Sequence, residues 1–256
     1  MILAIDVGNT NTAIGCIVGR DISHVFRVST NISKTADECA VDLKNILGFH
    51  SVDIAGVSGA IISCVVPPLT HVFKLAIKLL AGIDAIVVGA GVKTGINILI
   101  DDPGQLGGDM VATAVGALAS YEPPLIVVDM GTATKMYVIN RSGSSLGGSI
   151  SPGLSLSMDA LAAGTSQLPR VQIEAPQKCI SANTIDCMKS GAVFGAASLI
   201  DGMTERFEAE LGESAQIIVT GGLAEAVYRH CRRGVIHDPH LILHGLRVIY
   251  EKNRRV

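Results

Sequence analysis

The chain has 256 residues, of which 48% are hydrophobic and 17% charged, enough apolar material for one large core or two smaller ones. Its formal charge of −3 argues against a general nucleic-acid-binding protein, because there is no excess of lysine and arginine to neutralise phosphates. The longest stretch without Asp, Glu, Lys or Arg, residues 54–73, contains glycines and prolines, so no membrane-spanning helix is expected. No signal peptide is expected either, because no basic segment precedes the first apolar run and Asp6 interrupts that run.

The first half of the sequence predicts alternating strands and helices. Residues 2–18 form two β-rich segments around a Gly/Asn/Thr loop, which is typical of a hairpin, with Asp6 just before the loop. Thr35 and Glu38 have the spacing of a capping box and predict a helix over 35–47. The same reasoning predicts a strand at 59–66, a helix at 70–80 and a strand at 84–88.

Asp109 follows Gly107 and Gly108 at the start of an apolar helix. An acidic residue in this place is stabilised by the helix dipole, so helix capping is one interpretation. The other is a general base that takes a proton from a hydroxyl group, with the glycines leaving room for a substrate. The sequence around Asp109 leaves both open.

The second half repeats the plan of the first. Residues 125–139 predict a second hairpin, in which Asp129 lies about half a chain length after Asp6. A strand at 215–220 leads into Gly221 and Gly222. Helices are predicted at 157–164, 183–211 and 241–252, and the composition of the Gly/Ser-rich residues 147–161 is also typical of a flexible linker. We therefore predict an α/β protein of two duplicated lobes, 1–120 and 121–256, each a mixed sheet flanked by helices.

Both hairpins suit phosphate chemistry. Each places an aspartate at a strand end, where a carboxylate can hold a cation and a glycine-containing loop can offer backbone N–H groups to phosphate oxygens. Thr220, Gly221 and Gly222, between a strand and an expected helix start, are a further candidate nucleotide-binding turn. Asp-x-Gly also occurs in ordinary turns, and the P-loop, dinucleotide and nucleophile-elbow motifs are absent.

The order of the motifs resembles that of type III pantothenate kinases. The motifs include IDVGNTNTAIG, TADECA, SCVVPPL, VKTGINI, DDPGQLGGDM, VVDMGTATK, LGGSISPGLSLSMDAL, NTIDCMKSGAVFG and TGG, and they span nearly the whole chain. The resemblance implies the actin, sugar-kinase and heat-shock ATPase superfamily, with two ribonuclease-H-like lobes and nucleotide in the cleft between them. It implies transfer of the γ-phosphoryl group of ATP to the primary hydroxyl of pantothenate, the first step of coenzyme A synthesis.

The resemblance also implies cofactors, partners and residue roles. It implies a homodimer with the substrate site at its interface, Mg²⁺ bound with ATP, a monovalent cation, K⁺ or NH₄⁺, and a substrate-facing loop and helix over residues 147–161. A cytoplasmic location is predicted separately, because the six cysteines are scattered and form no CxxC pair, which suggests reduced thiols. Asp109 would accept the proton, Asp6 would lie at Mg-ATP and Asp129 would bind the monovalent cation. The ATP-binding residues would be Asp6, Val7, Gly8, Asn9, Thr10, Asn11, Thr12, Ala13, Thr132, Gly221 and Gly222. The substrate-binding residues would be Gly107, Gly108, Asp109, Met110 and, from the neighbouring subunit, Thr184.

Five positions differ from the residues usual in the family. They are Ile100, Gly104, Met110, Lys135 and Tyr137. The family usually has arginine where Met110 stands, and methionine cannot pair with the carboxylate of pantothenate. Lys135 or Arg170 are candidates to supply that charge. The differences keep an alternative open, a relative that binds nucleotide as a regulator or acts on another small alcohol.

Overall fold

The computed structural model describes residues 1–254, which form two compact units. Unit 1 comprises Met1–Ile96, Asp101–Ser120 and the segment from Leu241, and unit 2 comprises Asn97–Ile100 and Tyr121–His240. These units differ from the predicted ranges 1–120 and 121–256 in two segments, because the C-terminal helix packs within unit 1 and residues 97–100 pair within unit 2. No helix among residues 1–254 is long and apolar enough to cross a membrane.

Unit 1 is built on a five-stranded sheet in the order β3-β2-β1-β4-β5. The predicted hairpin forms its centre, since β1 pairs antiparallel with β2 and parallel with β4. Leu3, Ala4 and Ile5 of β1 are fully buried, as expected for a central strand covered on both faces. The strands are β1 (Ile2–Val7), β2 (Asn11–Val18), β3 (Asp21–Ser29), β4 (Gly59–Cys64) and β5 (Ile86–Val87).

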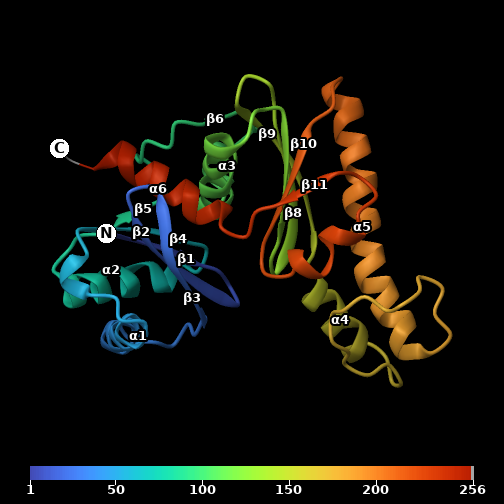
Figure 1. Ribbon diagram of the computed structural model, residues 1–256, viewed down its shortest axis with the longest axis horizontal. Helices are drawn as coiled ribbons and strands as arrows, with labels where there is room; N and C mark the ends of the chain where they lie inside the picture. The colour runs from blue at the N-terminus through green and yellow to red at the C-terminus, as the bar shows by residue number, and fades with distance from the viewer. Residues whose placement is uncertain (255–256) are drawn as a thin grey trace. The chain divides into compact units, whose positions relative to one another are not determined.

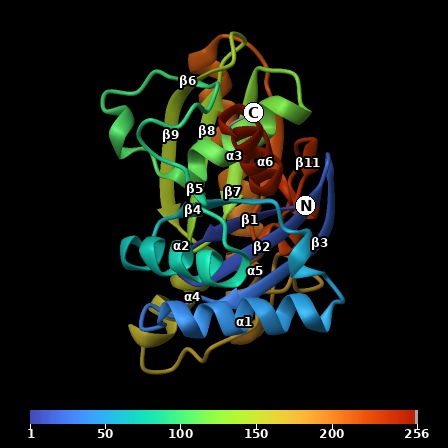
Figure 2. The same cartoon turned by 90° about the vertical axis from the view of Figure 1, so that its left-hand side faces the viewer.

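Two helices cover each face of this sheet (Figures 1 and 2). On one face lie α1 (Ala36–Phe49) and α2 (Pro67–Ala81); on the other lie α3 (Gly108–Ser120) and α6 (Leu241–Asn253). The predicted capping box of α1 is confirmed, with Thr35 and Glu38 bonded in both directions. α3 and α6 approach closely at Gly116 and Gly245, because a Cβ atom on either glycine would collide with the backbone of the other helix. This contact holds α3, and with it Asp109, against the sheet.

Unit 2 contains a six-stranded sheet in the order β11-β10-β7-β8-β9-β6. Apart from β6, the order and directions of its strands repeat those of unit 1, with an antiparallel β7–β8 hairpin beside parallel β10 and β11. The predicted fold class, an α/β protein with two mixed sheets flanked by helices, is confirmed. The strands are β6 (Asn97–Ile98), β7 (Leu125–Met130), β8 (Ala133–Ile139), β9 (Ser144–Pro152), β10 (Gln216–Thr220) and β11 (Val235–His237).

The long helix α5 (Thr184–Leu211) packs on the unit 2 sheet next to α4 (Leu154–Ala163) (Figure 1). Asn183 caps α5, because its side chain accepts the N–H of Asp186 at 2.9 Å. Strand β9 was not predicted, and it occupies the Gly/Ser-rich segment expected as a loop. Its glycines suit the position, since a Cβ at Gly148 would overlap the Met136 carbonyl of β8. Residues 1–254 also contain four 3₁₀ turns: η1 (Ile54–Gly56), η2 (Pro103–Gln105), η3 (Ala224–Ala226) and η4 (Tyr228–His230).

Candidate active site

The loop between β1 and β2 brings most of the predicted phosphate-binding residues together in unit 1. Its backbone is anchored by Thr30, whose Oγ1 donates to the Gly8 carbonyl at 2.7 Å and whose N–H donates to the Thr10 carbonyl at 2.9 Å. The hydroxyl of Thr12, which is 1% exposed, lies 3.0 Å from that of Thr30. Residues 9–11 at the tip are exposed. The loop is therefore fixed from behind, while its tip is open to a ligand.

Asp6 is the penultimate residue of β1 and is partly buried. Its partner across the hairpin is Ala13, and its neighbour in β4 is Ser63. Within residues 1–254 no three His, Cys, Asp or Glu side chains gather into a group that could hold a metal ion. Mg²⁺ commonly binds one or two carboxylates together with substrate phosphates, so one carboxylate beside a phosphate-binding loop fits Mg²⁺ bound with a nucleotide.

Asp109 lies in the first turn of α3 and is partly exposed. Its Oδ1 accepts the N–H of Met110 at 2.8 Å, and its carbonyl oxygen accepts the Thr113 hydroxyl at 2.7 Å. A Cβ atom at Gly107 would clash with Asp109 Oδ1, and one at Gly108 would come within 3.3 Å of the Val88 carbonyl. The helix N-terminus therefore orients this carboxylate, and the glycines provide its space. The contact with Met110 is compatible with both helix stabilisation and base catalysis.

Asp129 occupies in β7 the place that Asp6 occupies in β1, and its partner across the hairpin is Lys135. Lys135 Nζ lies 2.8 Å from Asp129 Oδ2, and the two side chains are only 16% and 20% exposed. The structure thus pairs two residues for which separate roles were predicted, a cation ligand for Asp129 and a contact of the pantothenate carboxylate for Lys135. Arg170, the other candidate for the carboxylate of pantothenate, is 83% exposed, with Nε 3.6 Å from Asp159 Oδ1.

The turns around the second hairpin depend on glycine. The N–H of Gly153 donates to the carbonyl of Thr132 at 3.1 Å, and a Cβ at Gly153 would overlap the carbonyl oxygens of Gly131 and Thr132. Gly221, with φ +98°, packs against the backbone of Met130. Thr132 is exposed on this surface.

The prediction of a helix start after Gly222 is wrong. The 3₁₀ turn η3 follows instead, because the N–H of Ala224 bonds to the Gly221 carbonyl three residues back, at 3.2 Å. A turn of this length provides no helix dipole for a phosphate group. Any contact of Gly221 and Gly222 with ATP therefore uses their own backbone.

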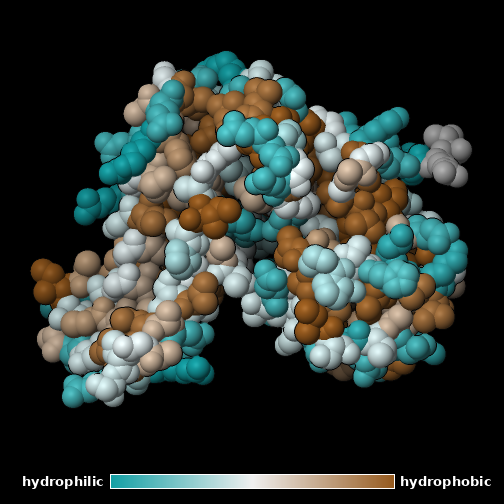
Figure 3. Space-filling view, turned by 180° about the vertical axis from the view of Figure 1, so that it is seen from behind, coloured by the Kyte–Doolittle hydropathy of each residue, from teal (hydrophilic) through white to brown (hydrophobic). Residues whose placement is uncertain are grey.

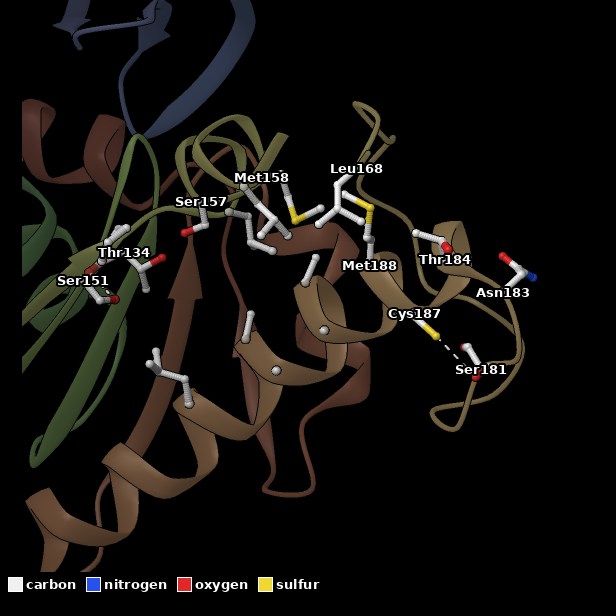
Figure 4. A pocket seen from close by; sticks show the side chains of 18 of the residues that line it. Thr134, Ser151, Ser157, Met158, Leu168, Ser181, Asn183, Thr184, Cys187 and Met188 are labelled. Atoms are coloured by element: carbon white, nitrogen blue, oxygen red, sulfur yellow. Dashed lines mark hydrogen bonds between the residues drawn. The ribbon is translucent and has the colours of Figure 1, made fainter. Parts of the chain in front are cut away.

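Unit 2 also contains an apolar cavity of about 1000 Å³ between α4 and α5 (Figure 4). Met158, Leu168 and Met188 gather at one end, and Thr184 lies beside them in the first turn of α5. Figure 3 shows mostly white to brown residues on the visible surface of this part of unit 2, at its lower left. The sequence reasoning missed the cavity. Its signal was the row of small residues in α5, namely Gly191, Ala192, Gly195 and Ala196.

A family model described as type III pantothenate kinase matches residues 2–206. A protein named Type III pantothenate kinase from Roseiflexus castenholzii is 40% identical over 255 residues, which cover 100% of both chains. One of the same name from Moorella thermoacetica is 38% identical over 253 residues, covering 99% of this chain and 100% of the relative. The chain belongs to the type III pantothenate kinase family.

Solved structures support the fold expected for this family. A putative 2-dehydro-3-deoxygalactonokinase from Sinorhizobium meliloti has a TM-score of 0.60 at 14% identity and covers 100% of this chain and 98% of its own. A ROK family glucokinase from Streptomyces griseus has a TM-score of 0.53 at 15% identity, with 98% of each chain covered. At these identities the likeness concerns the fold alone.

For this member of the type III pantothenate kinase family, the predicted site residues fall into three groups. Unit 1 carries residues 6–13 on its central hairpin and residues 107–110 at the start of α3. In unit 2, Gly221 lies against the end of β7 close to Asp129 and Thr132. Thr184 lies apart from that group in sequence and lines the apolar cavity.

Proposed function

We propose that this protein transfers the γ-phosphoryl group of ATP to the primary hydroxyl of pantothenate, forming 4′-phosphopantothenate in the first step of coenzyme A biosynthesis. The observation that carries the proposal is the full-length match, at 40% identity, to relatives named type III pantothenate kinases. Asp6, Asp109 and Asp129 occur at the positions that the family's motifs give to acidic residues, which supports an active enzyme.

Asp109 is proposed to accept the proton of the attacking hydroxyl. The hydrogen bond from the Met110 N–H fixes the direction of the carboxylate, and fixed geometry is what general-base catalysis requires. Gly107 and Gly108 present no side chains, so a small alcohol can approach the carboxylate over them. Met110 and Thr184 are proposed as further contacts of pantothenate.

ATP is proposed to bind with its phosphates on the loop from Asp6 to Ala13, and to contact Thr132, Gly221 and Gly222. Asp6 would hold Mg²⁺ together with phosphate oxygens, and the ion would offset their negative charge. Phosphoryl transfer depends mainly on positioning and charge neutralisation, which this loop, anchored by Thr30, can supply. A monovalent cation at Asp129 is not part of this proposal, because the Lys135 ammonium already contacts that carboxylate.

We further infer a homodimer in the cytoplasm. The apolar cavity along α5 is open at the surface of unit 2, and a second subunit would cover it and bring Thr184 to its partner's substrate. The six cysteines are free thiols in this structure, in keeping with a reducing compartment that also supplies ATP. Light scattering coupled to gel filtration tests the dimer; a monomer at assay concentration would contradict it.

The test of the function compares ATP turnover with and without pantothenate for the wild type, Asp109→Asn and Asp37→Asn. Asp37 is the matched control, because it is also an aspartate in the first turn of a helix, α1. We expect pantothenate-dependent ADP from the wild type and the control, and a fall in kcat of about 10²–10⁴-fold for Asp109→Asn.

Three results would contradict parts of this proposal. Full activity of Asp109→Asn would remove Asp109 as the base. Thermal stabilisation by ATP without any pantothenate-dependent ADP would favour a nucleotide-binding regulator, and ADP formation only with a different alcohol would identify another substrate.

A further inference from the structure

The Asp129–Lys135 pair does not fit a monovalent metal ion at Asp129. The two residues face each other across the β7–β8 hairpin, and Lys135 Nζ lies 2.8 Å from Asp129 Oδ2. An ion bound to the same carboxylate oxygen would lie beside the ammonium group, and two like charges at that separation repel each other. The pair is largely shielded from solvent, with side-chain exposures of 16% and 20%, so water weakens this repulsion only in part.

A lysine ammonium can take the place of such an ion. It carries one positive charge and three N–H donors at the end of a flexible stem, and it contacts carboxylate oxygens at about the distance of a charge-assisted hydrogen bond. Here the stem begins on the neighbouring strand, directly opposite Asp129, so the protein backbone itself delivers the charge. Asp129 with Lys135 has the same net charge as Asp129 with one bound monovalent cation.

The pair also lies where a fixed charge affects phosphate chemistry. Asp129 and Met130 end strand β7, and the Gly131–Thr132 turn follows directly. Gly221 packs against the backbone of Met130, the residue that separates Asp129 from this turn. These are the unit 2 residues assigned above to ATP. A positive charge held here needs no ion from solution to be in place when the nucleotide binds.

We propose that the Lys135 ammonium is a built-in replacement for a monovalent cation, and that this enzyme therefore works without K⁺ or NH₄⁺. This inference rests on the proposed kinase function. Lys135 acts as a positioning residue, which holds Asp129 and the adjoining turn in the geometry that Mg-ATP requires. The inference gives Lys135 a different task from that of binding the carboxylate of pantothenate.

The experiment measures pantothenate-dependent ADP formation at constant ionic strength in tetramethylammonium, Na⁺, K⁺ or NH₄⁺ chloride. It compares the wild type with Lys135→Ala and with Lys78→Ala. Lys78 is the matched control, because its Nζ also lies 2.8 Å from an aspartate oxygen, that of Asp84, but at an exposed site. We expect the wild type and Lys78→Ala to have the same rate in all four salts.

Lys135→Ala is expected to lose activity by about a hundredfold in tetramethylammonium and to regain it, saturably, with K⁺ or NH₄⁺. Lys135→Met, which keeps the length of the side chain without its charge, should lose the activity but respond less to the ions, because its stem fills the space. A role confined to folding would not produce rescue that depends on the identity of the ion.

Thermal unfolding gives a readout that does not require activity. An ion that binds only the folded protein raises its midpoint, so K⁺ should stabilise Lys135→Ala relative to Na⁺ and leave the wild type unchanged. If the wild type forms product only in K⁺ or NH₄⁺, the inference is wrong and the kinase function stands. If no salt gives product, the function is wrong, and the thermal measurement still decides the inference. A higher KM for pantothenate in Lys135→Ala, with no response to ions, would overturn it in favour of substrate binding.

Discussion

The β1–β2 and β7–β8 hairpins occupy equivalent places in their sheets but present different chemistry. Each carries an aspartate one residue before its first strand ends, and each lies beside a parallel strand, β4 or β10. Asp6 faces the methyl group of Ala13, whereas Asp129 faces the ammonium group of Lys135. The backbone arrangement is repeated, and the difference lies in a single cross-strand residue, alanine opposite Asp6 and lysine opposite Asp129.

The largest effect is expected from a substitution that places a lysine opposite Asp6, as Lys135 lies opposite Asp129. In Ala13→Lys the new ammonium should reach Asp6, since residues directly opposite in an antiparallel pair lie on the same face. It would compete with Mg²⁺, and we expect kcat/KM for Mg-ATP to fall by about 10²–10³-fold. Steady-state kinetics at varied Mg²⁺ measure this. Ala13→Met is the uncharged control, and equal losses in both variants would show that bulk, not charge, is responsible.

The second comparison concerns how the two turns are held. In unit 2 the turn packs against Gly153, and the Cβ of Gly153→Ala would overlap two carbonyl oxygens. We expect this overpacking to lower the free energy of unfolding by about 1–3 kcal/mol, measured by urea denaturation. Gly48→Ala, where the added methyl group meets nothing within 4 Å, should not lower it. If Gly153→Ala is as stable as the control, the turn moves away from the added methyl group without lowering the free energy of unfolding.

In unit 1 the corresponding turn is held by hydroxyl groups. Thr12→Val removes the contact with Thr30 Oγ1 while keeping the shape of the side chain. The expected loss of stability is about 0.5–1.5 kcal/mol, the usual net value of one hydrogen bond. Amide hydrogen exchange should quicken at Thr30, whose N–H bonds to the Thr10 carbonyl. Unchanged exchange there would show that Thr30 holds the loop without Thr12.

The smallest expected effect concerns the outer parallel strand of unit 2. Tyr121 donates its hydroxyl to Asp238, just after β11, at 3.1 Å, and burial together with the Asp238 charge raises the pKa of Tyr121 to about 12. The folded state therefore holds this proton more tightly than the unfolded state. The resulting stability is complete below about pH 10, the ordinary pKa of tyrosine, and is lost as the pH rises towards 12.

Tyr121→Phe removes this contribution. The difference in urea midpoint between the wild type and Tyr121→Phe should be largest at pH 8 and shrink above pH 10. A difference independent of pH would mean that Tyr121 acts through packing and not through its proton.

Local signals made much of the fold predictable. The capping box at Thr35 and the two Asp-containing hairpins depend on residues close in sequence, and the structure contains all of them. Strand β9 escaped prediction because its glycines and serines have low strand propensity, and its place is decided by contact with β8. The apolar face of α6 predicted a helix but not its partner, which is α3 of unit 1.

The neighbouring sequence also predicted where two candidate site residues lie, Asp6 at a strand end and Asp109 at a helix start. The Asp129–Lys135 contact requires the register of the second hairpin as well. That register follows from a turn centred on Thr132, so the signal was present in the sequence. For the cavity beside Thr184 the sequence shows only the small residues of α5, and its size and position depend on how α4 and α5 pack.

The close contact between Gly116 of α3 and Gly245 of α6 has a consequence for synthesis of the protein. The ribosome completes α6 only after α3 and all of unit 2 have been made. Until then the helix that carries Asp109 lacks one of the surfaces on which it packs. A chain interrupted before Leu241 would contain every proposed catalytic residue and still lack the helix that supports its proposed base, so we expect activity only once α6 has been translated.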